Sequence, residues 1–120
     1  MEIRKIKVNG NNYQFVNSSR STRNGFAHDT TLFKNDYEIA EYSCHYLNRT
    51  WEWYRYQTVM LRCVEAEIDR EYNRFIDNYK YTNNIKRLTA EKRAEIEKDF
   101  YNREDIKELR KVYKKLNERN

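Results

Sequence analysis

The amino-acid sequence predicts an α+β fold, in which a four-stranded antiparallel sheet is followed by two long helices that form an αα-hairpin on one face of the sheet. Two observations predict it. Residues 1–50 alternate apolar and polar side chains between turn formers, whereas residues 51–120 carry apolar side chains at helical spacing. A length of 120 residues is that of one ordinary domain. Residues 1–120 are therefore expected to fold as a single domain with a β part and a helical part.

The β part is expected to hold four strands. Alternating apolar residues on both sides of Asn9-Gly10 predict a hairpin, because this dipeptide favours the tightest hairpin turn. The polar run at 17–25 predicts a loop. A third strand is expected over 26–33 and a fourth over 37–47, and the fourth is apolar on both faces. This pattern predicts that a helix covers one face of the sheet.

Residues 51–80 predict a long helix, because their apolar side chains fall within about a third of the helical circumference. The main stripe consists of Trp53, Tyr54, Met60, Leu61, Val64, Ile68, Tyr72, Phe75 and Tyr79. A second, weaker strip of Tyr56, Val59 and Cys63 lies beside it. Two strips on one helix predict two packing partners, the sheet and another helix.

A last helix is expected after a break at 81–88, with Thr89 as its N-cap. Its apolar stripe is imperfect and weakens at 102–105, where Asn102 is a candidate cap for a separate helix. This segment is sparse in apolar residues, so it is expected to pack against the preceding helix.

The chain is basic, with a net charge of +5 and a pI of about 9.2. Residues 81–120 carry 12 Lys and Arg against 8 Asp and Glu. Cations near a helix C-terminus are ordinary features of a solvated helix, but clustered cations also bind nucleic-acid phosphates and acidic proteins. Lys111, Lys114 and Lys115 are the candidates there, and Arg20 and Arg23 are candidates in the 17–25 loop.

Aromatic residues and arginines are densest between residues 46 and 57. Such mixtures make both packed cores and binding hot spots. Trp51 and Arg55 lie off the main apolar stripe, and Arg62 lies on the same side, so these three are candidate surface contacts.

The sequence does not predict an enzyme. In the pairs His28-Asp29 and Cys44-His45, neighbouring side chains on a strand point to opposite faces, so neither pair is a ready dyad. The spacing of Cys and His matches no structural zinc pattern, and there is no glycine-rich phosphate loop. No metal site and no cofactor are therefore expected. No apolar run has the length of a membrane span and no signal-peptide core is present, so an intracellular protein without membrane contact is expected.

Two segments carry a resemblance to known proteins. The run CHYLNRTWEWYRYQTVM at 44–60, with RNGFAH at 23–28, resembles small accessory proteins encoded by phages and prophages of Gram-positive bacteria. The likeness covers about residues 1–80 and offers no catalytic residues. It implies a phage protein in the cytoplasm of the bacterial host. Genes of this setting also encode anti-defence proteins, including anti-CRISPR inhibitors.

Together these observations favour an anti-defence inhibitor that binds stoichiometrically to a bacterial defence nuclease, such as a Cas effector with or without its guide RNA. Its positive charge argues against mimicry of DNA. One alternative is a small basic protein that binds RNA or DNA directly, and another is a structural module that self-associates through its helices as a homodimer. The candidate binding residues are Arg20, Arg23, Trp51, Arg55, Arg62, Lys111, Lys114 and Lys115.

Overall fold

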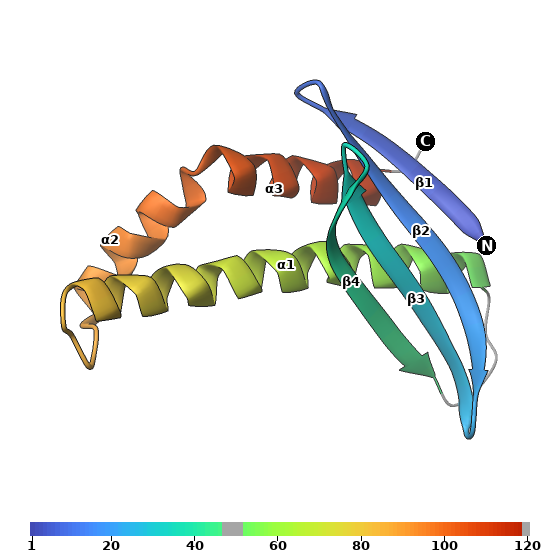
Figure 1. Ribbon diagram of the computed structural model, residues 1–120, viewed down its shortest axis with the longest axis horizontal. Coiled ribbons are helices and arrows are strands. Elements are labelled where there is room, and N and C mark those ends of the chain that lie inside the picture. The colour runs from blue at the N-terminus through green and yellow to red at the C-terminus, as the bar shows by residue number, and fades with distance from the viewer. Residues whose placement is uncertain (47–51, 119–120) are drawn as a thin grey trace.

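A computed structural model describes residues 1–46 and 52–118, except for the side chains of residues 52–55. Strands β1 (Glu2–Val8), β2 (Asn11–Thr22), β3 (Gly25–Lys34) and β4 (Tyr37–Tyr46) form an antiparallel sheet in the order β1-β2-β3-β4. Helices α1 (Glu52–Thr82), α2 (Ala90–Tyr101) and α3 (Glu104–Asn117) follow, and lie on one face of the sheet (Figure 1). The α+β class and the four-stranded sheet are confirmed.

Two of the turns follow from short polar dipeptides. Asn9 and Gly10 both have positive φ, 52° and 81°, as do Asn35 and Asp36, with 49° and 70°. Two consecutive residues of positive φ twist a two-residue hairpin in the same sense as its strands, and Asn, Asp and Gly adopt this conformation most readily. The predicted hairpin at Asn9-Gly10 is confirmed.

The predicted polar loop at 17–25 is wrong over most of its length. Strand β2 continues to Thr22, which pairs with Gly25, so only Arg23 and Asn24 form the turn. Asn17 is fully buried on the helix-covered face. Ladder pairing with β3 satisfies the backbone of this polar run, and such tertiary context overrides low β-propensity.

The predicted pair of long helices is also wrong, because the last segment is divided in two. Helix α2 ends at Tyr101, and Asn102 closes its C-terminus instead of capping the next helix. Thr89 is confirmed as the N-cap of α2, since its hydroxyl accepts a hydrogen bond from the Lys92 amide at 3.2 Å. The division falls where the apolar stripe weakens, between Tyr101 and Glu104.

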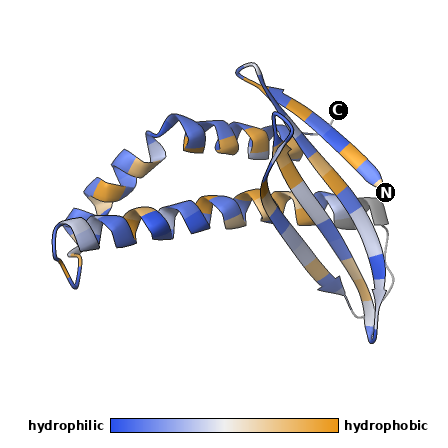
Figure 2. Ribbon diagram, in the orientation of Figure 1, coloured by the Kyte–Doolittle hydropathy of each residue, from blue (hydrophilic) through white to orange (hydrophobic). Residues whose placement is uncertain are grey.

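The main core lies between the sheet and the helices. Its central residues come from the sheet and from all three helices and are fully or almost fully buried: Tyr13, Phe15, Leu32, Val64, Phe100, Ile106, Val112 and Leu116. A second cluster joins Tyr56 and Val59 of α1 to Cys44 of β4. The prediction that α1 contacts both the sheet and another helix is confirmed. Figure 2 shows the hydrophobic residues concentrated where the helices cross the sheet.

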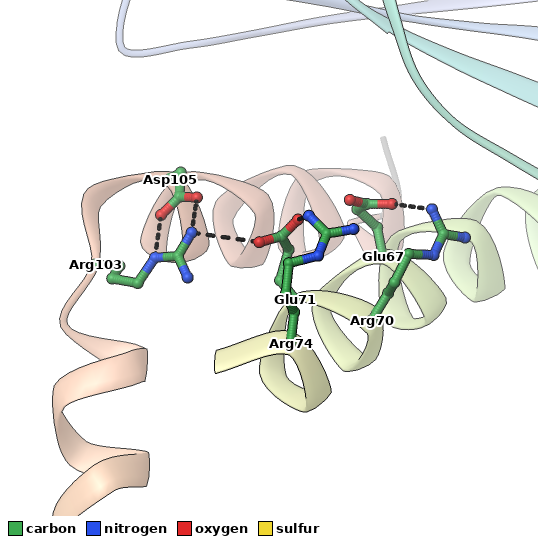
Figure 3. Close-up of polar contacts among 6 residues, drawn as sticks. All are labelled: Glu67, Arg70, Glu71, Arg74, Arg103 and Asp105. Atoms are coloured by element: carbon green, nitrogen blue, oxygen red, sulfur yellow. Dashed lines mark hydrogen bonds and ion pairs between the residues drawn. The ribbon is translucent and has the colours of Figure 1, made fainter. Parts of the chain in front are cut away.

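Beyond the sheet, the chain continues as a helical arm, residues 66–103, made of the C-terminal part of α1, the whole of α2 and the connection to α3 (Figure 1). Arg103 anchors this connection. Its guanidinium lies 2.6 Å from Asp105 and 3.5 Å from Glu71 of α1 (Figure 3). It also lies 5.8 Å from the ring of Phe75 and 5.5 Å from that of Phe100. Polar and cation–π contacts thus hold the α2–α3 connection against α1 within the arm.

A buried carboxylate ties α3 to the sheet. Glu108 is 7% exposed and accepts hydrogen bonds from the Tyr13 hydroxyl at 2.5 Å and the Asn11 amide at 2.7 Å, with the Lys34 ammonium at 3.6 Å. Burial pushes the pKa of Glu108 upward, but the hydrogen bonds and the Lys34 charge outweigh it and hold that pKa below its usual value. Burial and the neighbouring carboxylate raise the pKa of Tyr13. Glu108 therefore stays ionised and fixes the register of α3 on the sheet.

Candidate binding surfaces

The C-terminal lysines of α3 lie against the edge of the sheet. The Lys115 ammonium donates a hydrogen bond of 2.8 Å to the carbonyl oxygen of Lys7, a residue 108 positions away. Since β1 is an edge strand, this contact occupies a carbonyl that no other strand of the sheet pairs with. It places Lys115 at the backbone of β1, whereas the side chains of Lys5 and Lys7, which alternate with the buried Ile6 and Val8, lie on the face that the helices leave uncovered. We call the exposed group Lys5, Lys7, Lys111, Lys114 and Lys115 the β1–α3 basic surface.

Arg20, predicted as a free loop cation, is paired inside the sheet. Its Nε lies 3.0 Å from the carboxylate of Asp29 on the neighbouring strand, and Asp29 also accepts a hydrogen bond from Ser43. Both groups lie on the face of the sheet that the helices leave uncovered. Arg20 is thereby engaged as the counter-ion of Asp29.

Arg23 occupies the tip of the β2–β3 hairpin and is exposed. Together with Thr22, Asn24, His45 and Tyr46, it lines a pocket of about 270 Å³, which we call the hairpin-tip pocket. The β2–β3 turn is at the opposite end of the sheet from the β1–β2 turn, near which Lys7 lies (Figure 1). The predicted binding residues therefore belong to separate places and do not form one site.

The remaining candidates are on or near α1. Arg62 is exposed on that helix. Trp51 and the side chain of Arg55 lie outside the described residues. The predicted contact formed by these three side chains stays a prediction.

Three polar side chains whose proximity the sequence did not predict meet where α1 crosses the sheet. The Ser19 hydroxyl lies 2.8 Å from Nδ1 of His28 and 2.7 Å from the hydroxyl of Tyr56. Ser19 and His28 are directly opposite each other on β2 and β3. A serine hydroxyl hydrogen-bonded to a histidine supplies the nucleophile and the base of a catalytic triad, which also needs a third group that orients the histidine. Asp29, however, lies on the opposite face of β3, as strand alternation predicts, and is bound by Arg20 and Ser43, so it does not orient this imidazole.

This serine–histidine–tyrosine cluster acts as a polar contact between α1 and the sheet. His28 is 4% exposed and Tyr56 is 8% exposed. Their rings meet edge to face, with centroids 5.2 Å apart. Only knowledge of the β2–β3 register could have revealed the cluster, because the sequence places its residues in different elements.

Within residues 1–46 and 52–118, no group of three or more His, Cys, Asp or Glu side chains is arranged to hold a metal ion. None of the described helices is both long enough and apolar enough to cross a membrane. Comparisons with protein families, with curated proteins and with solved structures find no match for this chain.

Proposed function

We propose that this protein is a phage-encoded inhibitor of a bacterial defence nuclease, in the first instance an anti-CRISPR protein, and that it acts by stoichiometric binding. Its target would be a Cas effector or the nucleic acid that the effector carries. The observation that carries the proposal is the contact between Lys115 and the Lys7 backbone, which places the exposed lysines of α3 at the edge strand β1, whose own lysines are also exposed.

The charge of this surface supports contact with phosphates or with acidic protein. Lys111 and Lys114 are exposed on α3, and no ion pair joins either of them to another of the described residues. Clustered cations steer association with an anionic partner and gain affinity by releasing counterions from nucleic acid. A net charge of +5 suits a partner of this kind and does not suit imitation of DNA.

The resemblance of residues 44–60 to phage accessory proteins supports the biological setting of the proposal. It carries no residue roles, so the contact surface rests on the geometry of β1 and α3 alone.

The test is a cleavage assay with purified Cas ribonucleoproteins of several types, after capture by the immobilised protein. We expect capture to survive nuclease treatment and cleavage to fall at near-equimolar protein. Unchanged cleavage by every effector type at a large molar excess would overturn the proposal.

A charge-reversal pair maps the contact. Lys111→Glu with Lys114→Glu should weaken inhibition at least about tenfold, because two attractive charges at the surface become repulsive. Lys86→Glu with Lys98→Glu makes the same change in net charge on the arm and should leave inhibition within about twofold. Lys115 is left in place in both variants, because its hydrogen bond to β1 is structural.

A further inference from the structure

We propose that the hairpin-tip pocket binds a phosphate group of a nucleic-acid strand. This inference rests on the proposed function for its biological ligand, the RNA or DNA of the target complex. Its chemistry rests on the pocket alone.

The shape of the pocket follows from the register of the sheet. Thr22 pairs with Gly25 at the end of the β2–β3 ladder, and Ala27 pairs with His45, so the β2–β3 turn and the last residues of β4 lie at the same end of the sheet. The pocket is the space between the turn residues Thr22, Arg23 and Asn24 and the strand end at His45 and Tyr46. Its volume of about 270 Å³ suits a phosphate with its sugar better than a complete cofactor.

The lining of the pocket is suited to an anion. Arg23 supplies a guanidinium, whose N–H groups can bind two phosphate oxygens at once. Thr22 offers a hydroxyl, Asn24 an amide and His45 an imidazole N–H, all of which can donate a hydrogen bond to a phosphate oxygen. None of the described residues that line it carries a carboxylate.

Other pockets of the described chain differ in this respect. The one between α1 and α3, of about 560 Å³, is lined by Glu65 and Asp69, and one on the uncovered face of the sheet is lined by Asp29 and Glu41. Carboxylates in these places would repel a phosphate. The hairpin-tip pocket is thus the better anion site of the three.

The pairing of Arg20 strengthens this assignment. Asp29 lies one position further along the uncovered face of β3 than Ala27, and its negative charge would otherwise reach the pocket. The Arg20 guanidinium at 3.0 Å compensates that charge. Arg20 thereby assists phosphate binding indirectly, whereas Arg23 and His45 make the contact.

A phosphate group can belong to a strand or to a free nucleotide, and the chemistry of the pocket is the same for both. The turn residues Arg23 and Asn24 that line the pocket are both exposed, so an extended strand can reach it from solvent. This geometry favours the strand.

The experiment measures fluorescence anisotropy of labelled single-stranded RNA and DNA 20-mers with the full-length protein, over a range of salt concentrations. Unlabelled mononucleotide and inorganic phosphate serve as competitors. We expect Arg23→Ala to raise the dissociation constant about tenfold and to reduce the slope of log K against log salt by about one. His45→Ala should raise it several-fold.

Arg87→Ala is the matched control, because it removes the same charge from an exposed position between α1 and α2, at the far end of the arm. It should change the dissociation constant by less than about twofold. Arg23 is in an exposed turn, so its loss should leave the thermal transition of the protein unchanged, which circular dichroism checks.

The outcomes separate clearly. If Arg23→Ala and Arg87→Ala weaken binding equally, or if neither oligonucleotide binds at low salt, the phosphate pocket is disproved, whereas nuclease-resistant capture of a Cas effector would leave the proposed function standing. If mononucleotide competes as well as the oligonucleotide at equal phosphate concentration, the assignment to a strand is overturned in favour of a free nucleotide. Selective loss in Arg23→Ala with weak mononucleotide competition supports the proposal in full.

Discussion

The sheet end of the molecule and the helical arm are stabilised by different interactions. At the sheet end, aromatic and aliphatic side chains such as Phe15, Leu32 and Val112 are entirely buried between the strands and the helices. Along α2, the buried side chains among the described residues are Ile96 and Phe100. The arm adds to this smaller apolar contribution the ion pairs and the cation–π contacts of Arg103.

This difference indicates which part of the molecule unfolds locally. Apolar burial is not screened by salt, whereas exposed ion pairs are screened and are individually weak. The sheet end should therefore unfold only with the whole molecule, and the arm should open locally at lower cost.

The largest effect is expected at the sheet end. Phe15→Ala should lower the free energy of unfolding by about 3–5 kcal/mol, because it removes a fully buried ring and leaves a cavity. Urea titration followed by circular dichroism measures this loss. A loss below about 1 kcal/mol would show that the core described here is not the main source of stability.

A smaller effect, with a pH signature, is expected for the two buried glutamates. Glu108→Gln should destabilise the protein by about 1–3 kcal/mol at neutral pH, because Tyr13, Asn11 and Lys34 lose a charged acceptor. The folded-state pKa of Glu108 is lowered, so its contribution is present above the unfolded value of about 4.3 and is lost as pH falls through the folded pKa. The variant should lose less stability on acidification than the parent.

Glu67, where the arm begins, should behave in the opposite way. Burial raises its pKa, although Arg70 at 2.7 Å counteracts the shift. Its contribution is present below the unfolded pKa and is lost as pH rises through the folded one. Glu67→Gln should therefore flatten the decline in stability that the parent shows as pH rises from the unfolded value of about 4.3 through the folded pKa. Urea midpoints measured at several pH values test both glutamates, and parallel profiles for the two variants would contradict their different surroundings.

The smallest effect is expected from Arg103→Ala. It removes the ion pair with Glu71 and the contacts with Phe75 and Phe100, and should cost about 1–2 kcal/mol, confined to the arm. Hydrogen exchange should then quicken in α2 while the sheet amides keep their protection. Lys86→Ala, an exposed change of the same charge, is the control. Equal acceleration in the sheet and the arm would show that the two regions are not separable.

Local signals in the sequence predicted the parts of the fold that depend on local chemistry. Asn9-Gly10 has one favoured hairpin conformation, and Thr89 caps α2 through its own hydroxyl. The polar residues from Asn17 to Thr22 misled the prediction because their strand conformation depends on pairing with β3, a long-range cause. The break at Asn102 was visible only as a weakened apolar stripe.

The candidate surfaces were less predictable because they depend on register and on distant contacts. Whether Arg20 is free depends on Asp29 lying across from it, and the sequence alone does not show that register. Lys7 and Lys115 come together only once α3 has returned to β1. In the sequence, His45 is notable only as the neighbour of Cys44, and its place with Arg23 in one pocket becomes visible only when the end of β4 is set against the hairpin tip.

The order of the elements along the chain has a consequence for synthesis. All four strands precede α1, and a ribosome adds about 5–20 residues per second. The four strands therefore emerge from the ribosome several seconds before the helices that cover them, and during that time the apolar face of the sheet, with Phe15 and Leu32, is exposed to solvent. In this interval the growing polypeptide is a natural client for a chaperone, and truncation before α3 should yield an aggregating product.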